Sequence, residues 1–249
     1  MKFLALMICC FFWINVNAQN IAKSKMENIK ITENSIVKDS TGNVYAFNTW
    51  KALLATGRYA LKAENTRDKN TQFLIIRLSD EAFERKLKNL PKPPESNSFK
   101  TGAAFYPLKA RDINNEKINT KKLAGKILVI NFWFVNCPPC VMEIPELNKI
   151  VDEYKNDSNI VFLAVALDKS TDLEEFLSNH PFKYTIIDDG RFITTNYKIT
   201  SYPTNIVISP EGKIHFSSSG YSGISTTNWI KKSIEELKKT AAAETISSQ

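Results

Sequence analysis

The chain has 249 residues, of which 43% are hydrophobic, and its 33 Lys and Arg outnumber 26 Asp and Glu to give a net charge of +7. This length predicts one or two domains, and the apolar fraction is sufficient for a buried core. The basic residues are scattered or mixed with acidic ones, and no basic stripe with interleaved aromatic residues occurs, so we expect no nucleic-acid partner.

The first 18 residues have the pattern of a secretory signal peptide. Lys2 precedes an apolar run at residues 3–14, and small residues end the segment at Ala18. Cleavage after Ala18 predicts an exported, soluble product, located in the periplasm if the cell has an outer membrane. An uncleaved leader acting as a membrane anchor is the alternative, although its apolar run is shorter than the ~20 residues of a spanning helix. No later segment predicts stable insertion in a membrane.

Residues 19–90 predict a small α+β module of unknown role. Strand-like segments occur near residues 44–47 and 73–78, and Ser79 is suited to cap a following helix. The module contains no chemical motif. Clustered prolines at residues 91–98 then disfavour a helix and predict a semi-rigid linker.

Residues 99–240 alternate between strand and helix signals, which predicts an α/β domain. An apolar run at 127–134 is suited to a central strand that is buried on both faces. A disordered tail is expected at 241–249. The other expected elements are helices at 138–154, 171–179 and 226–239, and strands at 160–167, 184–187, 204–209 and 213–217.

The most informative motif is Cys137-Pro138-Pro139-Cys140, at the junction of the 127–134 strand and the next helix. The unpaired N–H groups at a helix N-terminus favour a thiolate, which is the attacking species in disulfide exchange. The motif therefore predicts redox chemistry at Cys137 and Cys140.

Two other roles for the cysteine pair are less consistent with the sequence. A zinc site needs about four ligands, but the only other cysteines, Cys9 and Cys10, belong to the leader, and His180 and His215 are far apart. A structural disulfide would close a loop too small to constrain the unfolded chain strongly. We expect no metal, and no cofactor other than the redox-active Cys137–Cys140 disulfide.

The order of these elements around the motif is that of a thioredoxin-like fold, a central mixed sheet flanked by helices. The chain resembles the TlpA/ResA group of extracytoplasmic thiol-disulfide oxidoreductases from about Ser98 to Lys239. The resemblance is carried by GKILVINFW at 125–133 leading into the cysteine motif, by Glu143-x-Pro145, and by three shorter segments. These are AFYPL at 104–108, similar to an entry strand, ITSYPT at 199–204, similar to a proline loop, and PEGKI at 210–214, similar to a hairpin turn.

The resemblance implies a role for each matching residue. Cys137, expected to be the more exposed sulfur, would be the nucleophile, and Cys140 would resolve the mixed disulfide. A cis Tyr202–Pro203 bond would present the backbone of Tyr202 to a client. The expected substrate-binding residues are Tyr202, Pro203, Trp133, Pro138 and Pro139, of which Trp133 is also suited to the core.

Glu143 has two interpretations. It follows Cys140 by three residues and therefore lies on a similar face of the helix; it is either an ordinary solvated glutamate or a partly buried carboxylate that exchanges a proton with the thiols. Asn131 stands where thioredoxins carry a buried acid, so proton transfer would depend on Glu143 or water. Asn136 stands where the family commonly has Trp, which leaves the surface beside the nucleophile more polar.

The predicted function is that of an exported thiol-disulfide oxidoreductase that reduces protein disulfides. The resemblance implies protein thiol or disulfide clients, a membrane-embedded electron donor of the DsbD/CcdA type, and a role in cytochrome c maturation. A redoxin-type peroxidase is one alternative, although residues 130–136 lack the Pro and Thr that this chemistry places before its cysteine. A noncatalytic binding module is the other alternative.

Overall fold

The computed structural model describes residues 31–64 and 72–247, so the expected signal peptide at 1–18 lies outside the described residues. The chain divides into two compact units between Phe83 and Glu84. Within the described residues, no helix is both long and apolar enough to cross a membrane.

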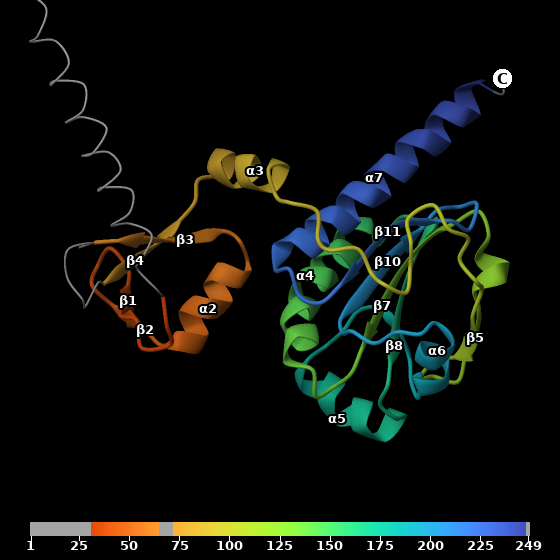
Figure 1. Cartoon of the computed structure of the whole chain (residues 1–249), viewed down its shortest axis with the longest axis horizontal. Helices are drawn as coiled ribbons and strands as arrows, with labels where there is room; N and C mark the ends of the chain where they lie inside the picture. The colour runs from red at the N-terminus through yellow and green to blue at the C-terminus, as the bar shows by residue number, and fades with distance from the viewer. Residues whose placement is uncertain (1–30, 65–71, 248–249) are drawn as a thin grey trace, which may run out of the picture. The chain divides into compact units, whose positions relative to one another are not determined.

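The first unit is a small α+β module, as expected (Figure 1). Its four-stranded sheet has the order β2-β1-β4-β3, in which only the β1–β4 pair is parallel. Val37, Trp50, Phe73 and Ile75 form its buried core. The elements are β1 (Val37–Lys38), β2 (Val44–Tyr45), α2 (Phe47–Ala55), β3 (Tyr59–Ala63), β4 (Phe73–Arg77) and α3 (Asp80–Lys88), within which the boundary falls.

The second unit has the predicted thioredoxin-like architecture. Its five-stranded sheet has the order β11-β10-β7-β8-β9; β7, β8 and β9 are parallel, and β10 is antiparallel to both β7 and β11. In chain order the elements are β5 (Lys109–Arg111), β6 (Lys117–Asn119), the 3-10 helix η1 (Thr120–Leu123), β7 (Ile127–Trp133), α4 (Pro138–Tyr154), β8 (Ile160–Ala166), α5 (Ser170–Asn179), β9 (Thr185–Ile187), α6 (Arg191–Asn196), β10 (Thr204–Ile208), β11 (Ile214–Ser219) and α7 (Ile224–Ser247).

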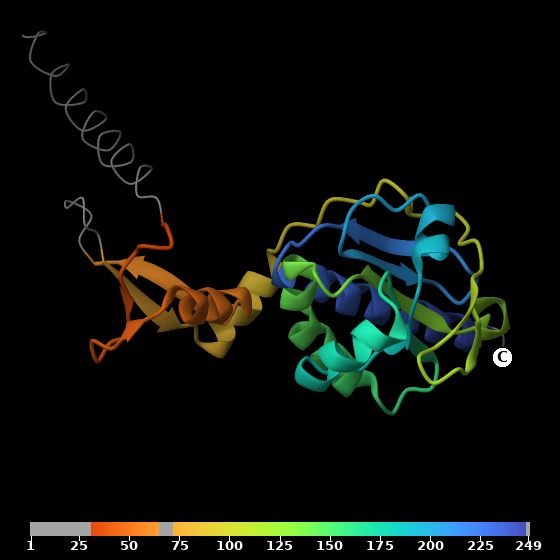
Figure 2. The ribbon, with the colours of Figure 1, turned by 90° about the horizontal axis from the view of Figure 1, so that it is seen from below.

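Helices and a loop cover the two faces of this sheet (Figures 1 and 2). Every residue of β7 is buried, as expected for a central strand. Alternate residues of β7, including Val129 and Trp133, pack with apolar side chains of α4 and α7. Ile130 and Phe132 point to the opposite face and pack with residues near α6 and in the 99–108 segment. The cysteine motif therefore extends from the most deeply buried strand of the unit.

The proline-rich segment is part of the second unit and does not link the two units, so the boundary expected at 91–98 was wrong. A proline segment has unpaired carbonyl groups, and neighbouring elements supply their donors. Ser219 N–H donates to Pro94 O at 3.3 Å, and Ser225 Oγ donates to Pro91 O at 2.5 Å. The boundary at Phe83 precedes this segment.

Two other expectations also need correction. Helix α7 continues to Ser247, so residues 241–247 are helical where a disordered tail was expected; Ala241, Ala242 and Ala243 are strong helix formers. The expected entry strand at 104–108 is reduced to a single bridge between Ala104 and Lys213. Pro107 lacks the N–H group that a strand ladder requires, and the first strand of this unit is β5.

Candidate functional site

Cys137 and Cys140 form a disulfide at the start of α4, with their Cα atoms 5.2 Å apart. Cys137 is the N-cap residue, and Cys140 lies in the first turn. Helix α4 begins here because Pro138 and Pro139, at its first two positions, have a backbone angle preorganised for a helical turn. The sequence thus places a reducible S–S bond at the positive end of a 17-residue helix.

The two prolines also decide which backbone donors face the sulfurs. Neither Pro138 nor Pro139 has an N–H group. The N–H of Val141 is occupied, because it donates to Cys137 O at 3.0 Å. The N–H of Cys140 is therefore the first backbone donor of the helix that can face the sulfurs. Stabilisation of a thiolate at Cys137 therefore depends on this amide and the helix dipole, and fewer donors contribute than the motif alone suggested.

Both cysteines are buried in this disulfide form. Cys137 is 3% exposed and Cys140 1%. Cys137 is the more exposed of the two, as expected, but only slightly, because apolar neighbours of the α4 core enclose both residues. The exposed neighbours of the disulfide are Asn136 and Pro138, and Pro139 is half-buried. Access to Cys137 from solvent is therefore over these residues.

The Tyr202–Pro203 peptide bond is cis, as predicted. Pro203 is buried and Tyr202 half-buried. The Tyr202 ring packs edge-on against Phe134 with a centroid distance of 5.4 Å, and it contacts the apolar cluster that contains both cysteines. The proline loop is thus on the same side of the unit as the dithiol.

Glu143 is a buried carboxyl group, so its interpretation as a solvated glutamate was wrong. Only 2% of the residue is exposed. Asn131 Nδ2 donates to Glu143 Oε1 at 2.8 Å, and Asn205 Nδ2 donates to Oε1 at 3.1 Å. Burial raises the pKa of Glu143 from its ordinary 4.5 to about 8, although the hydrogen bonds from Asn205 and Asn131 act in the opposite direction. This carboxyl can therefore gain or lose a proton near neutral pH.

Trp133 is a core residue and not a surface that a client can touch. It is 1% exposed, and its ring packs against Phe176 and Phe182 at centroid distances of 5.4 and 5.5 Å. Its position on β7 turns the side chain towards α4 and away from solvent. The expected substrate-binding role of Trp133 is therefore corrected to a packing role.

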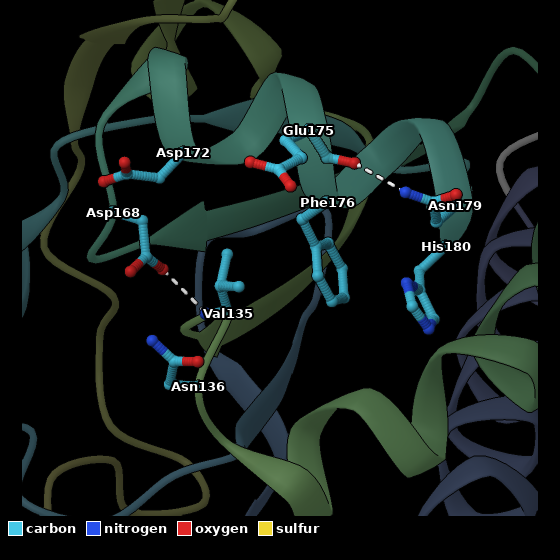
Figure 3. A pocket seen from close by; sticks show the side chains of 8 residues that line it. All are labelled: Val135, Asn136, Asp168, Asp172, Glu175, Phe176, Asn179 and His180. Atoms are coloured by element: carbon cyan, nitrogen blue, oxygen red, sulfur yellow. Dashed lines mark hydrogen bonds between the residues drawn. The ribbon is translucent and has the colours of Figure 1, made fainter.

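A hollow of about 520 Å³ lies beside the two residues that precede Cys137 (Figure 3). Asp168, Asp172 and Glu175 give it three carboxylates, and Asp168 Oδ2 accepts a hydrogen bond from Val135 N–H at 2.7 Å. The ring of Phe176, in α5, stacks with that of His180, the C-cap residue of α5, at a centroid distance of 4.7 Å. These acidic residues were not predicted, because helix surfaces and surface loops commonly carry acidic residues. Within the described residues, no group of three or more His, Cys, Asp or Glu could hold a metal ion.

Asn205 is the other site residue that the sequence analysis missed. It is fully buried in β10, directly opposite Asn131 in β7. The available signal was a polar residue within an otherwise apolar strand segment, Thr204–Ile208. Such a residue needs a hydrogen-bond partner, and here the partner is Glu143.

Comparison with known proteins shows what the part of the chain around this site is similar to. The AhpC/TSA family matches residues 101–217. A thiol-disulfide oxidoreductase ResA of Halalkalibacterium halodurans is 32% identical over 104 residues, which are 41% of this chain and 59% of the relative. A thioredoxin-like protein YneN of Bacillus subtilis is 26% identical over 106 residues, 42% of this chain and 62% of the relative. The chain thus spans about three fifths of the length of these relatives.

Solved structures support the fold assignment. A proposed thiol:disulfide interchange protein DsbE from Chlorobium tepidum matches with a TM-score of 0.51 at 20% identity, over 56% of this chain and 98% of that chain. A proposed protein disulfide isomerase from Bacteroides thetaiotaomicron matches with a TM-score of 0.54 at 18% identity, over 61% and 98%. At these identities the likeness shows the fold alone, and it confirms the thioredoxin-like architecture.

Proposed function

We propose that this chain is a thiol-disulfide oxidoreductase acting on protein cysteines, and that it is related to the AhpC/TSA family, whose model matches residues 101–217. The observation that carries the proposal is the Cys137–Cys140 disulfide at the N-terminus of α4. Two relatives named thiol-disulfide oxidoreductase ResA are 32% identical to this chain, over 104 and 106 residues. The expected cofactor set is empty, because the dithiol itself carries the two electrons.

The proposed direction is reduction of client disulfides. The Cys137 thiolate attacks a client S–S bond, forming a mixed disulfide and releasing one client thiolate. Cys140 then attacks the Cys137 sulfur, which closes the Cys137–Cys140 bond and releases the second client thiolate. The client gains two electrons, and the pair is oxidised. The proton that leaves Cys140 is taken up by the Glu143 carboxylate, whose pKa of about 8 suits this exchange.

Client binding is assigned to the surface around the disulfide. Asn136 and Pro138 are exposed, Pro139 is half-buried, and Tyr202 precedes the buried cis Pro203. The backbone N–H and C=O groups of Tyr202 would pair with an extended client segment. The apolar ring of Tyr202 and the prolines favour an unfolded client with apolar residues beside its cysteine.

Export is a further part of the proposal. Residues 1–18 carry the signal-peptide pattern, which supports a soluble periplasmic product. A membrane-embedded donor of the DsbD/CcdA type would then re-reduce the disulfide, and cytochrome c maturation is the proposed physiological task. Fractionation of cells that express the whole chain tests the location, and a retained 1–18 segment in the membrane fraction would contradict cleavage.

Insulin reduction tests the proposed activity. The wild type, with dithiothreitol as electron source, should accelerate precipitation of the insulin B chain, whereas Cys137→Ser should fall to the uncatalysed rate. Equal rates for wild type and variant would overturn the proposal. A titration against a thiol buffer then sets the direction: a low potential supports a reductant, and a strongly oxidising potential supports disulfide formation in clients.

The two alternatives are separated by the same variants. A redoxin-type peroxidase would consume hydrogen peroxide in a Cys137-dependent reaction and leave insulin intact. A noncatalytic module would bind clients equally well with Cys137→Ser and would show no turnover. Residues 130–136 lack Pro and Thr, which favours the oxidoreductase over the peroxidase.

A further inference from the structure

Asn131 and Asn205 occupy one row of the central sheet. They are direct cross-strand partners in the β7–β10 register. Asn131 also pairs with Ala164 of β8, and Asn205 pairs with Ser218 of β11. Asn131 alternates with Ile130 and Phe132 along β7, so it shares the α4 face with Val129 and Trp133. The sheet thus places two amide side chains directly under the helix that carries the dithiol.

The hydrogen bonds of these amides converge on one carboxyl group. Asn131 Nδ2 donates to Glu143 Oε1 at 2.8 Å and to Asn205 Oδ1 at 2.9 Å, which occupies both of its hydrogens. Asn205 Nδ2 donates to both carboxyl oxygens, at 3.1 and 3.3 Å. Asn131 and Asn205 are 1% and 0% exposed. Since an ionised carboxylate only accepts hydrogen bonds, this arrangement fits the charged form.

Within the described part of the chain, Glu143 forms no ion pair with a Lys, Arg or His, so no cation helps the amides to stabilise its charged form. Glu143 follows Cys140 by three residues on α4, and its charge acts on Tyr184, before β9, and on Tyr221, between β11 and α7. Burial is the main cause that raises the pKa of both tyrosines, and the negative charge of Glu143 raises it further. Both tyrosines are therefore neutral wherever Glu143 titrates. The amides are the groups that oppose the effect of burial on Glu143.

We propose that Asn131 and Asn205 form an amide clamp, a pair of positioning residues that holds the Glu143 carboxyl beneath the dithiol and stabilises its ionised form. The proposal rests on the oxidoreductase function proposed above. Asn131 hydrogen-bonds to both other members, so the clamp fixes the carboxyl from the rigid centre of the sheet. An amide cannot exchange protons, and Glu143 is then the proton-exchanging group of this cluster.

Titration of Glu143 in the disulfide form tests the clamp directly, because Cys137 and Cys140 do not titrate while they are bonded. The probe is the carboxyl carbon of Glu143, followed by NMR as pH is varied. Asn205→Leu removes the amide donor and keeps the branching at Cγ, and it should raise the pKa of Glu143 by about one unit. Asn205→Ala is the second variant, if the leucine does not fold.

Ser218→Ala is the matched control. Ser218 pairs with Asn205 on the same face and is buried, and its Oγ has no hydrogen-bond partner within the described residues. The control should leave the Glu143 titration unchanged. A Glu143 titration in Asn205→Leu and Asn205→Ala that matches the wild type would overturn the clamp.

A second measurement separates positioning from general packing. Asn205→Leu should move the pH profile of Cys137 alkylation in the reduced protein, but should not move it further in a Glu143→Gln background. A further shift in that background would mean that Asn205 acts independently of Glu143, contrary to the proposal. If wild type fails to reduce insulin while the titration shifts as expected, the proposed function fails and the clamp stands.

Discussion

The Asn131 side-chain amide donates to the Glu143 carboxyl across 2.8 Å, and so connects the central strand β7 to the helix that carries the disulfide. Both residues are almost completely buried. A carboxyl group in such a place is costly to ionise and is held by hydrogen bonds instead of by a cation. The following predictions start from this arrangement.

Glu143→Gln should change how thiol reactivity depends on pH. In wild type burial raises the pKa of the Glu143 carboxyl to about 8, and this carboxyl lies on the same helix as the thiols, so the alkylation rate of Cys137 should rise in two steps. The variant should show a single step. Glu146→Gln is the control, because this residue lies one turn further along α4, half-buried and paired with Lys149. Superimposable profiles for Glu143→Gln and wild type would exclude a proton-exchange role.

The stability of the oxidised protein should fall as pH rises through the same range. The pKa of Glu143 is about 8 in the folded protein against 4.5 for the ordinary group, so the folded state binds this proton more tightly. The stabilisation is complete below about pH 4.5 and is lost progressively up to about pH 8. The free energy of unfolding of Glu143→Gln should therefore rise relative to that of wild type as pH increases, by a few kcal/mol at most. Urea unfolding of both proteins at pH 5 and pH 9 measures this change. The same stability difference between variant and wild type at both pH values would contradict the prediction.

Gly190→Ala should destabilise the second unit strongly. A Cβ atom at Gly190 would lie 2.4 Å from Val165 Cγ1 and 2.7 Å from the backbone oxygen of Ala166. Strand β8 cannot move away easily, because it is paired on both sides. We expect a loss of about 2–3 kcal/mol by chemical denaturation, as for an overpacked core.

Gly102→Ala is the comparison for that experiment. Gly102 has a φ of +84° with nothing within 4 Å of a new Cβ, so only backbone strain of about 1 kcal/mol is expected. If Gly190→Ala loses no more stability than Gly102→Ala, the sheet relaxes around the new methyl group and the prediction is wrong.

The proline-rich segment should loosen when its hydrogen bonds to α7 are removed. Ser225 Oγ donates to Pro91 O, and Trp229 Nε1 donates to Leu90 O at 3.4 Å. Ser225→Ala should cost about 1 kcal/mol and increase proteolysis near residues 90–96. Thr240→Ala, which removes an exposed hydroxyl bonded within α7, should leave cleavage unchanged. Equal cleavage of all three proteins would mean that packing alone holds the segment.

The sequence predicted those features that depend on local pattern. Helix α4 was expected at residues 138–154 and is found at Pro138–Tyr154, because prolines and a cysteine cap define its start. The cysteine motif led to the expected disulfide, and the family resemblance to the expected cis bond before Pro203; both are found in the structure. The burial of Glu143 was left open, since helical spacing alone does not say what covers a side chain.

Features that depend on distant contacts were not predictable in this way. Asn205 acquires its role only through pairing with Asn131, 74 residues earlier in the chain. The proline-rich segment looked like a linker because its carbonyl partners lie in β11 and α7, far along the sequence. The aromatic character of Trp133 suggested a binding surface, whereas β7 turns this side chain into the core.

Trapping of a mixed disulfide tests the central claim most directly. Cys140→Ser should leave Cys137 without its resolving partner, so that a reduced variant mixed with a disulfide-bonded client accumulates a covalent complex through Cys137. Peptide mapping by mass spectrometry identifies the linked cysteine, and Cys137→Ser should give no such complex. A complex formed equally well by Cys137→Ser, or none with either variant, would contradict nucleophilic attack by Cys137.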